Sequence, residues 1–218
     1  MAKPASGGAG GSGGRGRAVA PEPVSIEPVN GEFRDTAHMN AYIADQYNRL
    51  TDNAKAQVDK YQATMYINDR LRRGTKLDPE ERNHLNGLTA ALSTTQSDMV
   101  VYRGAGKLRQ IARLNNNGVL IGGEIGDKAF MSTSIAPGVG AKFARYYNKS
   151  DSGRPPTETT VFKINVPKGS KGFFPNPNDP DLGGDQEITF NRGSKLRVTK
   201  AKHDWLTNRW EIEADLIQ

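Results

Sequence analysis

The chain of 218 residues is long enough for one domain of ordinary size, with or without a tail. It has no cysteine and three scattered histidines, which excludes a disulfide framework and a thiolate metal site and argues against zinc. The net charge of +6 and the pI near 9.5 favour an acidic partner, such as a nucleic acid, a membrane surface or an anionic ligand. No apolar run reaches the roughly 18 residues of a membrane helix, and we see no apolar centre of a secretory signal.

Residues 1–30 consist mainly of Gly, Ser, Ala and Pro, with hardly any large apolar side chain before Val19. Such a segment buries too little apolar surface to offset the entropy lost on ordering, so we predict a disordered tail or linker. The folded domain is therefore expected in residues 31–218.

Between Phe33 and Leu92 the apolar residues recur at helical steps. They predict one helix over residues 39–50 and, after a break at residues 51–53, a second helix that includes Val58, Tyr61, Met65, Tyr66 and Leu71. Together they form the start of a small helical layer.

A third helix has a clear beginning. Asp78 has the position of an N-cap, Pro79 that of the first helical residue, and Glu81 completes a capping box. Leucines at 85, 88 and 92 then lie along one side, which predicts packing within the helical layer.

From Met99 onward the pattern changes to short β-prone runs. Strands are expected over residues 99–102, 129–134, 160–166, 185–190, 195–199 and 209–216. Helices are expected around Leu108, Ile111 and Leu114 and over residues 137–147. Helices first and mostly strands afterwards indicate an α+β fold, without the alternation of a doubly wound sheet.

The run at residues 185–190 is the most informative strand. Ile188 and Phe190 can face a core, which leaves Glu187 and Thr189 on the other face, with Asp185 beside Glu187. A loop rich in Pro, Gly, Asn and Asp, residues 173–184, leads into it. Two carboxylates are therefore expected to point the same way.

Four sequence segments occur in a particular order. They are Val101-Tyr102-Arg103-Gly104, Phe130-Met131-Ser132-Thr133-Ser134, residues 161–169 and Asp185-Gln186-Glu187-Ile188. This order resembles the Arg/Ser/Glu class of mono-ADP-ribosyltransferases, which includes the enzymatic components of clostridial binary toxins and related bacterial and phage enzymes. The resemblance covers roughly residues 40–217.

The resemblance implies a fold and a reaction. The fold is two short, roughly perpendicular sheets around an NAD cleft, with the helical layer on one side. The reaction is a transferase and glycosyltransferase step that moves ADP-ribose from NAD to a protein and releases nicotinamide, with NAD as co-substrate and no metal. A bacterial toxin, an injected effector or a bacteriophage protein that acts in a cytoplasm would fit.

By resemblance, Arg103 holds NAD and Glu187 is the catalytic glutamate. A guanidinium suits the diphosphate because it can donate two hydrogen bonds, and Gly104 lets the backbone come close. A carboxylate suits the sugar because positive charge develops there in the transition state. Ser132 is expected to hydrogen-bond to Glu187, and Thr133 and Ser134 to support the strand.

Two further NAD contacts are carried over. Phe143 matches an aromatic residue that stacks on nicotinamide, although a helix-face core position would also explain it, and Arg145 could reach the diphosphate from the same stretch. Asn68, in Tyr66-Ile67-Asn68, resembles an NAD-contacting asparagine, but the preceding tyrosine spacing is shorter than in the family.

The acceptor is predicted from Asp185. The family commonly has Glu there in enzymes that modify arginine and Gln in those that use asparagine or other acceptors. An acid can align or deprotonate a guanidinium, so we expect arginine, with a shorter reach than Glu. The loop at residues 173–186 is expected to contact the target, with Phe173 or Phe174 as candidates, although a phenylalanine at a strand edge can also simply be packed.

Other functions remain open at this point. An NAD glycohydrolase would use water as the acceptor. An inactive module of this fold would use its basic surface to bind nucleic acid or an assembly partner, and the retention of Arg103, Ser132 and Glu187 argues against it. Modification of a nucleic-acid-associated target is a further option that suits the +6 charge.

Overall fold

The computed structural model of the chain describes residues 25–64, 66–147, 158–179 and 185–218. The helices in these residues are α1 (Thr36–Asn48), α2 (Asp52–Thr64), α3 (Tyr66–Arg73), α4 (Pro79–Ala90), α5 (Arg109–Asn116) and α6 (Pro137–Tyr147). The strands are β1 (Ser93–Thr94), β2 (Met99–Ala105), β3 (Glu124–Gly126), β4 (Met131–Ser134), β5 (Thr159–Val166), β6 (Lys171–Phe173), β7 (Glu187–Phe190), β8 (Lys195–Asp204) and β9 (Arg209–Ile217).

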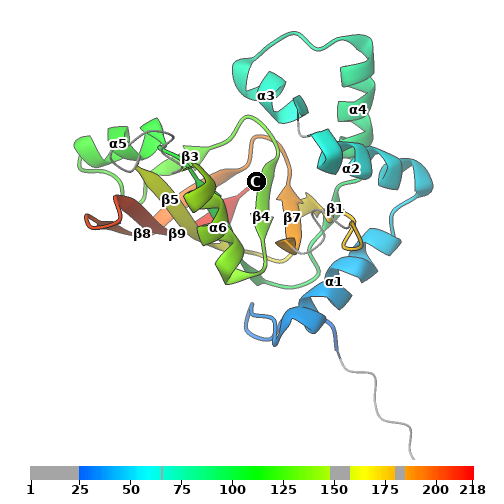
Figure 1. Ribbon diagram of the computed structural model, residues 1–218, viewed down its shortest axis with the longest axis horizontal. Coiled ribbons are helices and arrows are strands. Elements are labelled where there is room, and N and C mark those ends of the chain that lie inside the picture. The colour runs from blue at the N-terminus through cyan, green and yellow to red at the C-terminus, as the bar shows by residue number, and fades with distance from the viewer. Residues whose placement is uncertain (1–24, 65, 148–157, 180–184) are drawn as a thin grey trace, which may run out of the picture.

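Helices α1 to α4 form the layer that the sequence predicts, at one side of the sheet (Figure 1). The capping box of α4 is confirmed, because the Asp78 side chain accepts from the Glu81 backbone and the Glu81 side chain accepts from the Asp78 backbone, both at 2.8 Å. The single helix predicted from Val58 to Leu71 is two helices, α2 and α3. Met65, which was assigned to it, lies outside the described residues.

The strands form one continuous ladder in the order β1-β6-β7-β4-β2-β5-β9-β8-β3. Its two halves meet at β4 and β2, where the register contains one residue pair, Tyr102 opposite Ser134. The two short sheets that are expected from the sequence are therefore joined through this pair into one ladder. The pair also fixes Arg103, next to Tyr102, close to the Ser132 segment of β4.

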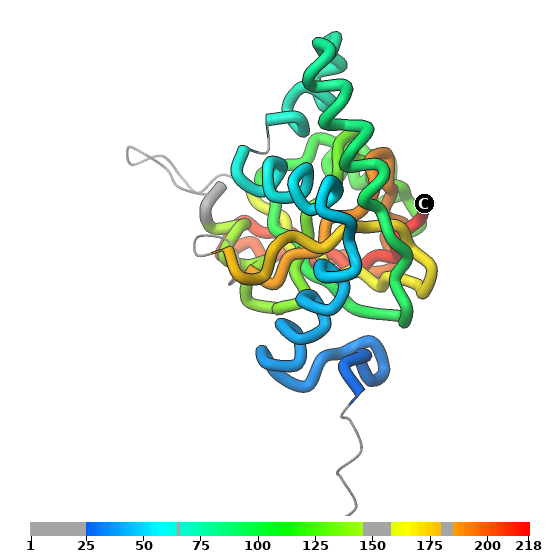
Figure 2. Tube along the Cα trace, turned by 90° about the vertical axis from the view of Figure 1, so that its right-hand side faces the viewer, coloured from blue at the N-terminus to red at the C-terminus, as the bar shows by residue number. Residues whose placement is uncertain are grey.

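Two hydrophobic cores hold the layers together. The larger one is built on the sheet and includes the alternating buried residues Met99 and Val101 of β2 and Phe162 and Ile164 of β5. The smaller one joins the helical layer to the sheet through Tyr61, Phe130 and other residues. Figure 2 shows α1 and α2 running beside the strands. The central strands are therefore packed against the core of the sheet and against the helical layer.

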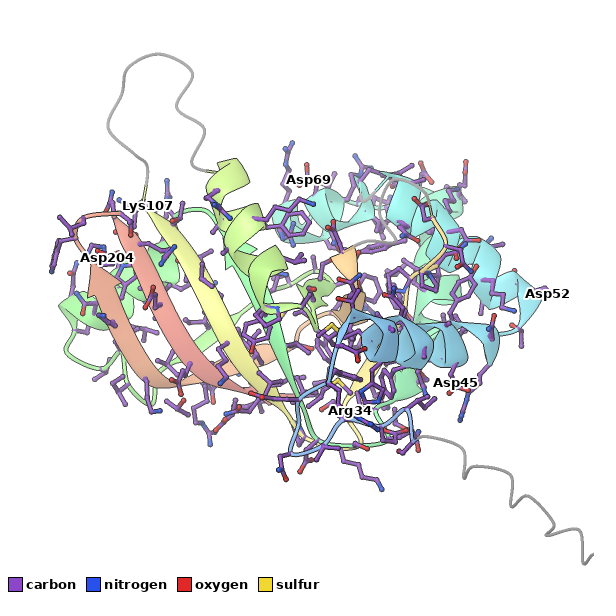
Figure 3. All side chains as sticks on the ribbon, turned by 60° about the horizontal axis from the view of Figure 1, so that its bottom comes forward. Arg34, Asp45, Asp52, Asp69, Lys107 and Asp204 are labelled. Carbon is purple, nitrogen blue, oxygen red and sulfur yellow. The ribbon has the colours of Figure 1, made fainter. Side chains whose placement is uncertain are left out.

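The long dimension of the molecule separates the helical layer from the far end of the sheet. Figure 3 shows Asp45 and Asp52 of the helical layer at one end and Lys107 and Asp204 at the other. No helix in the described part of the chain is long and apolar enough to cross a membrane.

Two strand limits differ from the sequence prediction and matter for the site. Strand β2 continues to Ala105, so Arg103 lies within the strand and not after its end. Strand β7 begins only at Glu187, because Gln186 has a positive φ of 42°, a left-handed conformation that cannot continue a strand. Asp185 therefore precedes the strand and does not share its face by alternation.

Candidate active site

A cavity of about 430 Å³ lies between the helical layer, β2, β4, β7 and α6. Eight of the residues that the sequence singles out for the site line it, and they are Asn68, Arg103, Gly104, Ser132, Thr133, Phe143, Asp185 and Glu187. Asn68 and Glu187, which are 119 positions apart along the chain, thus meet around one space, as the order of the motifs predicts. Within the described residues, no group of three or more His, Cys, Asp or Glu side chains could hold a metal ion.

Arg103 reaches into the cavity from β2, and Ser132 and Asp127 are among the residues that hold it. Its Nη1 donates a hydrogen bond of 2.6 Å to the backbone oxygen of Ser132, and its Nη2 lies 3.2 Å from Oδ2 of Asp127. The side chain is 19% exposed, so its charge is largely shielded from solvent. One face of the guanidinium fork is therefore fixed in the free protein.

A second arginine, Arg72, was not recognised in the sequence. It comes from α3, one helical turn after Asn68, and pairs with both oxygens of Asp127, through Nε at 3.1 Å and Nη2 at 2.9 Å. The spacing of Asn68 and Arg72 places both on one face of α3, and this spacing is the signal that would have found Arg72.

Arg72, Arg103 and Gly104 also line a second cavity of about 400 Å³. The floor of this cavity includes Ile125, Met131, Phe162 and Leu196. Two guanidinium groups therefore stand at the boundary between two neighbouring hollows. Paired guanidinium groups are suited to the oxygens of a phosphate or diphosphate.

Ser132 takes part in a chain of buried polar contacts. Its Oγ lies 3.1 Å from the hydroxyl of Tyr61, which accepts a hydrogen bond of 2.7 Å from Nδ2 of Asn68. Asn68 in turn accepts a hydrogen bond of 3.1 Å from the backbone N–H of Phe130 through Oδ1. Burial, and secondarily the charge of Glu187, raise the pKa of Tyr61 to about 12, so its hydroxyl stays protonated and can donate to Ser132.

Glu187 is half-buried at the start of β7, opposite Ser134 of β4. Its Oε1 accepts a hydrogen bond of 2.7 Å from Oγ1 of Thr189, which confirms that these two residues share a face of the strand. Burial raises the pKa of Glu187, and Asp185 raises it further, whereas hydrogen bonds from Thr189 and Ser132 and the charge of Arg103 lower it. Burial thus makes ionisation of Glu187 unfavourable, while the hydrogen bonds from Thr189 and Ser132 stabilise and orient the ionised carboxylate.

Thr133 and Ser134 brace the strand pair that carries Glu187. Thr133 Oγ1 donates a hydrogen bond of 2.8 Å to the backbone oxygen of Ile188, and Ser134 Oγ donates one of 2.6 Å to the backbone oxygen of Asp185. The supporting role that the resemblance implied for these hydroxyls is consistent with both contacts. They tie β4 to the turn before β7.

Asp185 lies beside Glu187 through this turn and not through strand alternation. Its side chain is 14% exposed, and its Oδ1 lies 2.9 Å from Nζ of Lys142 of α6. No local pattern predicts this ion pair, because the two residues are 43 positions apart in the chain and Lys142 has no distinctive neighbours. The expected result, two carboxylates at one site, is nevertheless present.

Phe143 and Gly104 face one another across the contact of α6 with β2. A Cβ added to Gly104 would lie 2.1 Å from the backbone oxygen of Gly140 and 2.9 Å from Cβ of Phe143. Gly104 is therefore required for the close approach of α6, a reason that the sequence did not suggest. Arg145, which was considered for the diphosphate, is exposed and does not line the cavity.

Phe173 and Phe174, the candidate target contacts, are packed in the core, which is the alternative that the sequence left open. Both are buried, at 0% and 1% exposure, and Phe173 packs edge-on against Tyr61 and Phe130. They anchor the beginning of the predicted target loop in the core. Of that loop, residues 180–184 lie outside the described residues.

Solved structures of several bacterial proteins share this fold. The C3 exoenzyme of Clostridium limosum is similar in structure, with a TM-score of 0.62 and 19% identity over 86% of this chain and 97% of that one. C3stau2 of S. aureus, solved with NAD, has a TM-score of 0.60 and 18% identity over 86% and 98%. Vis, an ADP-ribosyltransferase of Vibrio splendidus solved in complex with agmatine, has a TM-score of 0.59 and 19% identity over 87% and 89%.

A search of curated protein sequences gave no match. At these identities the structural neighbours show the fold. The family itself is shown by a sequence profile, described as ADP-ribosyltransferase exoenzyme, that matches residues 36–218. The chain therefore belongs to the ADP-ribosyltransferase exoenzyme family.

Proposed function

We propose that this protein transfers ADP-ribose from NAD to an arginine side chain of a target protein and releases nicotinamide. The observation that carries the proposal is that Arg103, Ser132 and Glu187 line one cavity with Asp185 beside them. Family membership supports NAD as the substrate. The acceptor is inferred from the site of this chain.

Arg103 and Arg72 are suited to the diphosphate. Both guanidinium groups donate hydrogen bonds to the carboxylate of Asp127, so their N–H donors lie side by side. Phe143 lines the cavity next to Gly104 and is the aromatic surface available to nicotinamide. NAD would then extend from the Glu187 side of the cavity toward the two arginines.

Glu187 is placed to act on the ribose. When the bond between C1′ and nicotinamide breaks, nicotinamide leaves as a neutral molecule with the bonding electrons, and positive charge develops on the sugar. A fixed carboxylate that accepts a hydrogen bond from the 2′-hydroxyl stabilises that charge, and Thr189 and Ser132 orient it. The acceptor nitrogen then bonds to C1′ and loses a proton.

Asp185 is the group that can pair with the guanidinium of the acceptor and accept the proton that its nitrogen loses. Its carboxylate lines the cavity beside Glu187, close to where the sugar cation would form. The neighbour Vis was solved with agmatine, which is arginine without its carboxyl group and therefore carries the same guanidinium. That complex supports a guanidinium acceptor for this chain as well.

The target is expected to approach over residues 173–186. In the described part of this segment, Gln62 of α2 holds Asn176 by accepting from its backbone N–H at 3.1 Å and donating to its backbone oxygen at 3.4 Å. The segment is thus attached to the helical layer at the edge of the site. A protein target in the cytoplasm of another cell fits the toxins among the structural neighbours.

The test uses NAD labelled in the adenylate phosphate, with agmatine as a small acceptor and a eukaryotic or bacterial lysate as a source of proteins. We expect labelled ADP-ribosyl-agmatine and labelled proteins whose modified residue, identified by mass spectrometry, is arginine. Asp185→Asn should retain NAD cleavage and lose transfer to agmatine. Free ADP-ribose as the only product would identify a glycohydrolase, and an asparagine product would refute the arginine acceptor.

A further inference from the structure

Lys142 of α6 occupies one oxygen of Asp185, the carboxylate that we assign to the acceptor. Nζ of Lys142 lies 2.9 Å from Oδ1 of Asp185. The same ammonium group lies 6.0 Å from the centre of the Phe143 ring, within range of a weak cation–π contact. Phe143 and Asp185 both line the cavity, so Lys142 contacts two residues of its wall, one on α6 and one in the turn before β7.

The two partners of this ion pair differ strongly in exposure. The Lys142 side chain is 67% exposed and the Asp185 side chain 14%. Asp185 is therefore fixed in the wall, where Ser134 also holds its backbone oxygen, whereas Lys142 can swing away into solvent. An ion pair with one such exposed partner is weak, because water competes for the ammonium group and the long side chain loses entropy when it is held.

An acceptor that pairs with Asp185 must compete with Lys142 for the same carboxylate. A neutral amide cannot displace an ammonium group from a carboxylate without losing charge complementarity. A guanidinium can, because its fork makes two charge-assisted hydrogen bonds where the ammonium group makes one directed contact. Lys142 therefore competes with every acceptor for Asp185, and an arginine acceptor displaces it most readily.

We propose that Lys142 is a specificity-determining residue that keeps Asp185 paired until a guanidinium acceptor replaces it. This inference rests on the proposed arginine acceptor and names Lys142 as the residue that favours arginine over other acceptors. The competing contact is intramolecular, so it is present whenever the acceptor position is empty. It also leaves the NAD-holding groups Arg103 and Glu187 untouched.

The test measures KM for agmatine in the wild-type protein and in Lys142→Met and Lys142→Arg. Methionine replaces the unbranched four-atom stem of lysine and removes the charged group, so KM for agmatine should fall about two- to five-fold, the range expected for loss of an exposed ion pair. Arginine at this position would hold Asp185 through its own fork and should raise KM. The expected order of KM is therefore Met below Lys below Arg.

Lys202→Met is the matched control. It removes the same charge from an exposed position on β8, close to Asp204 at the end of the molecule away from the helical layer (Figure 3). Its KM for agmatine should equal that of the wild-type protein. KM for NAD and the rate of NAD cleavage without acceptor should be the same in all four proteins. If Lys142 only held α6 against the turn that contains Asp185, its loss would move Phe143 and change KM for NAD as well.

The outcomes separate this inference from the proposed function. Transfer to agmatine with the same KM in the wild-type protein and both Lys142 variants would overturn the role of Lys142 and leave the arginine acceptor intact. An increase of KM in Lys142→Met would show that Lys142 helps the acceptor and would also overturn it. NAD cleavage without transfer to agmatine in any variant would refute the arginine acceptor, and this inference with it.

Discussion

The hydroxyl of Tyr61, a residue of the helical layer, lies 3.1 Å from Oγ of Ser132 on β4. Tyr61 is fully buried and also accepts a hydrogen bond from Asn68. Tyr61→Phe keeps the ring in the core but leaves Nδ2 of Asn68 without this acceptor. We expect the free energy of unfolding to fall by about 1–3 kcal/mol and kcat for NAD cleavage to fall as Ser132 loses its orientation.

Tyr47→Phe is a control for this prediction. The Tyr47 hydroxyl donates a hydrogen bond of 2.8 Å to Asp59, outside the residues that line the cavity. It should lower stability in urea unfolding and leave kcat unchanged. Equal kcat in Tyr61→Phe and the wild-type protein would show that Ser132 does not depend on this contact.

Arg103→Lys should weaken the binding of NAD. The guanidinium uses Nη1 for the Ser132 backbone and Nη2 for Asp127, and a single ammonium group cannot reach both and a diphosphate. We expect Kd for NAD to rise by on the order of ten-fold or more in isothermal titration calorimetry, since a charge-assisted hydrogen bond contributes about 1.5–3 kcal/mol. Arg49→Lys, on an exposed pair with Asp45 of α1, is the control and should bind normally. An unchanged Kd in Arg103→Lys would argue that the arginine does not hold NAD.

The sequence was sufficient for the residues whose neighbours carry a local pattern. Arg103, Ser132 and Glu187 stand in short apolar runs whose order along the chain is informative, and the structure places all three in one cavity. The capping box at Asp78 is likewise a local signal, since both of its hydrogen bonds join residues three apart.

The sequence failed where the site depends on long-range contacts. Asp127 pairs with arginines 24 and 55 positions away, and Lys142 with a carboxylate 43 positions away, so no periodicity marks them. Phe173 looked like a loop residue because its strand, β6, is three residues long. Asp185 lies beside Glu187 because Gln186 between them has a left-handed conformation, which strand alternation does not predict.

Gly104→Ala tests the contact between α6 and β2. The new Cβ would lie 2.1 Å from the Gly140 backbone oxygen, so the helix must shift, and overpacking of this kind costs about 1–3 kcal/mol. Thermal unfolding should show the loss, and KM for NAD should rise because Phe143 moves with α6. Gly126→Ala on β3 is the control, because its Cβ would meet only Lys195 Cγ at 3.7 Å. Equal stability of the two variants would refute the packing argument.

Glu187 should make both activity and stability depend on pH. Its folded-state pKa is raised above the usual value of 4.5, chiefly by burial, so the stability that its protonated form provides is lost as the pH rises through that raised pKa. Glu187→Gln is neutral at every pH. It should therefore unfold at higher urea concentration than the wild-type protein near neutral pH, with the difference disappearing under acidic conditions.

Activity should change in the opposite direction, because cleavage of NAD needs the ionised carboxylate. The rate should fall as the pH falls through the raised pKa, which places the acidic limb of the pH–rate profile above 4.5. Glu187→Gln should lose about 10²- to 10³-fold in kcat at neutral pH while it still binds NAD. Asp185→Asn should move the limb to lower pH, because the charge of Asp185 contributes to the raised pKa. A limb at the usual carboxyl value, unmoved in Asp185→Asn, would show that neither burial nor the neighbouring acid controls this group during the reaction.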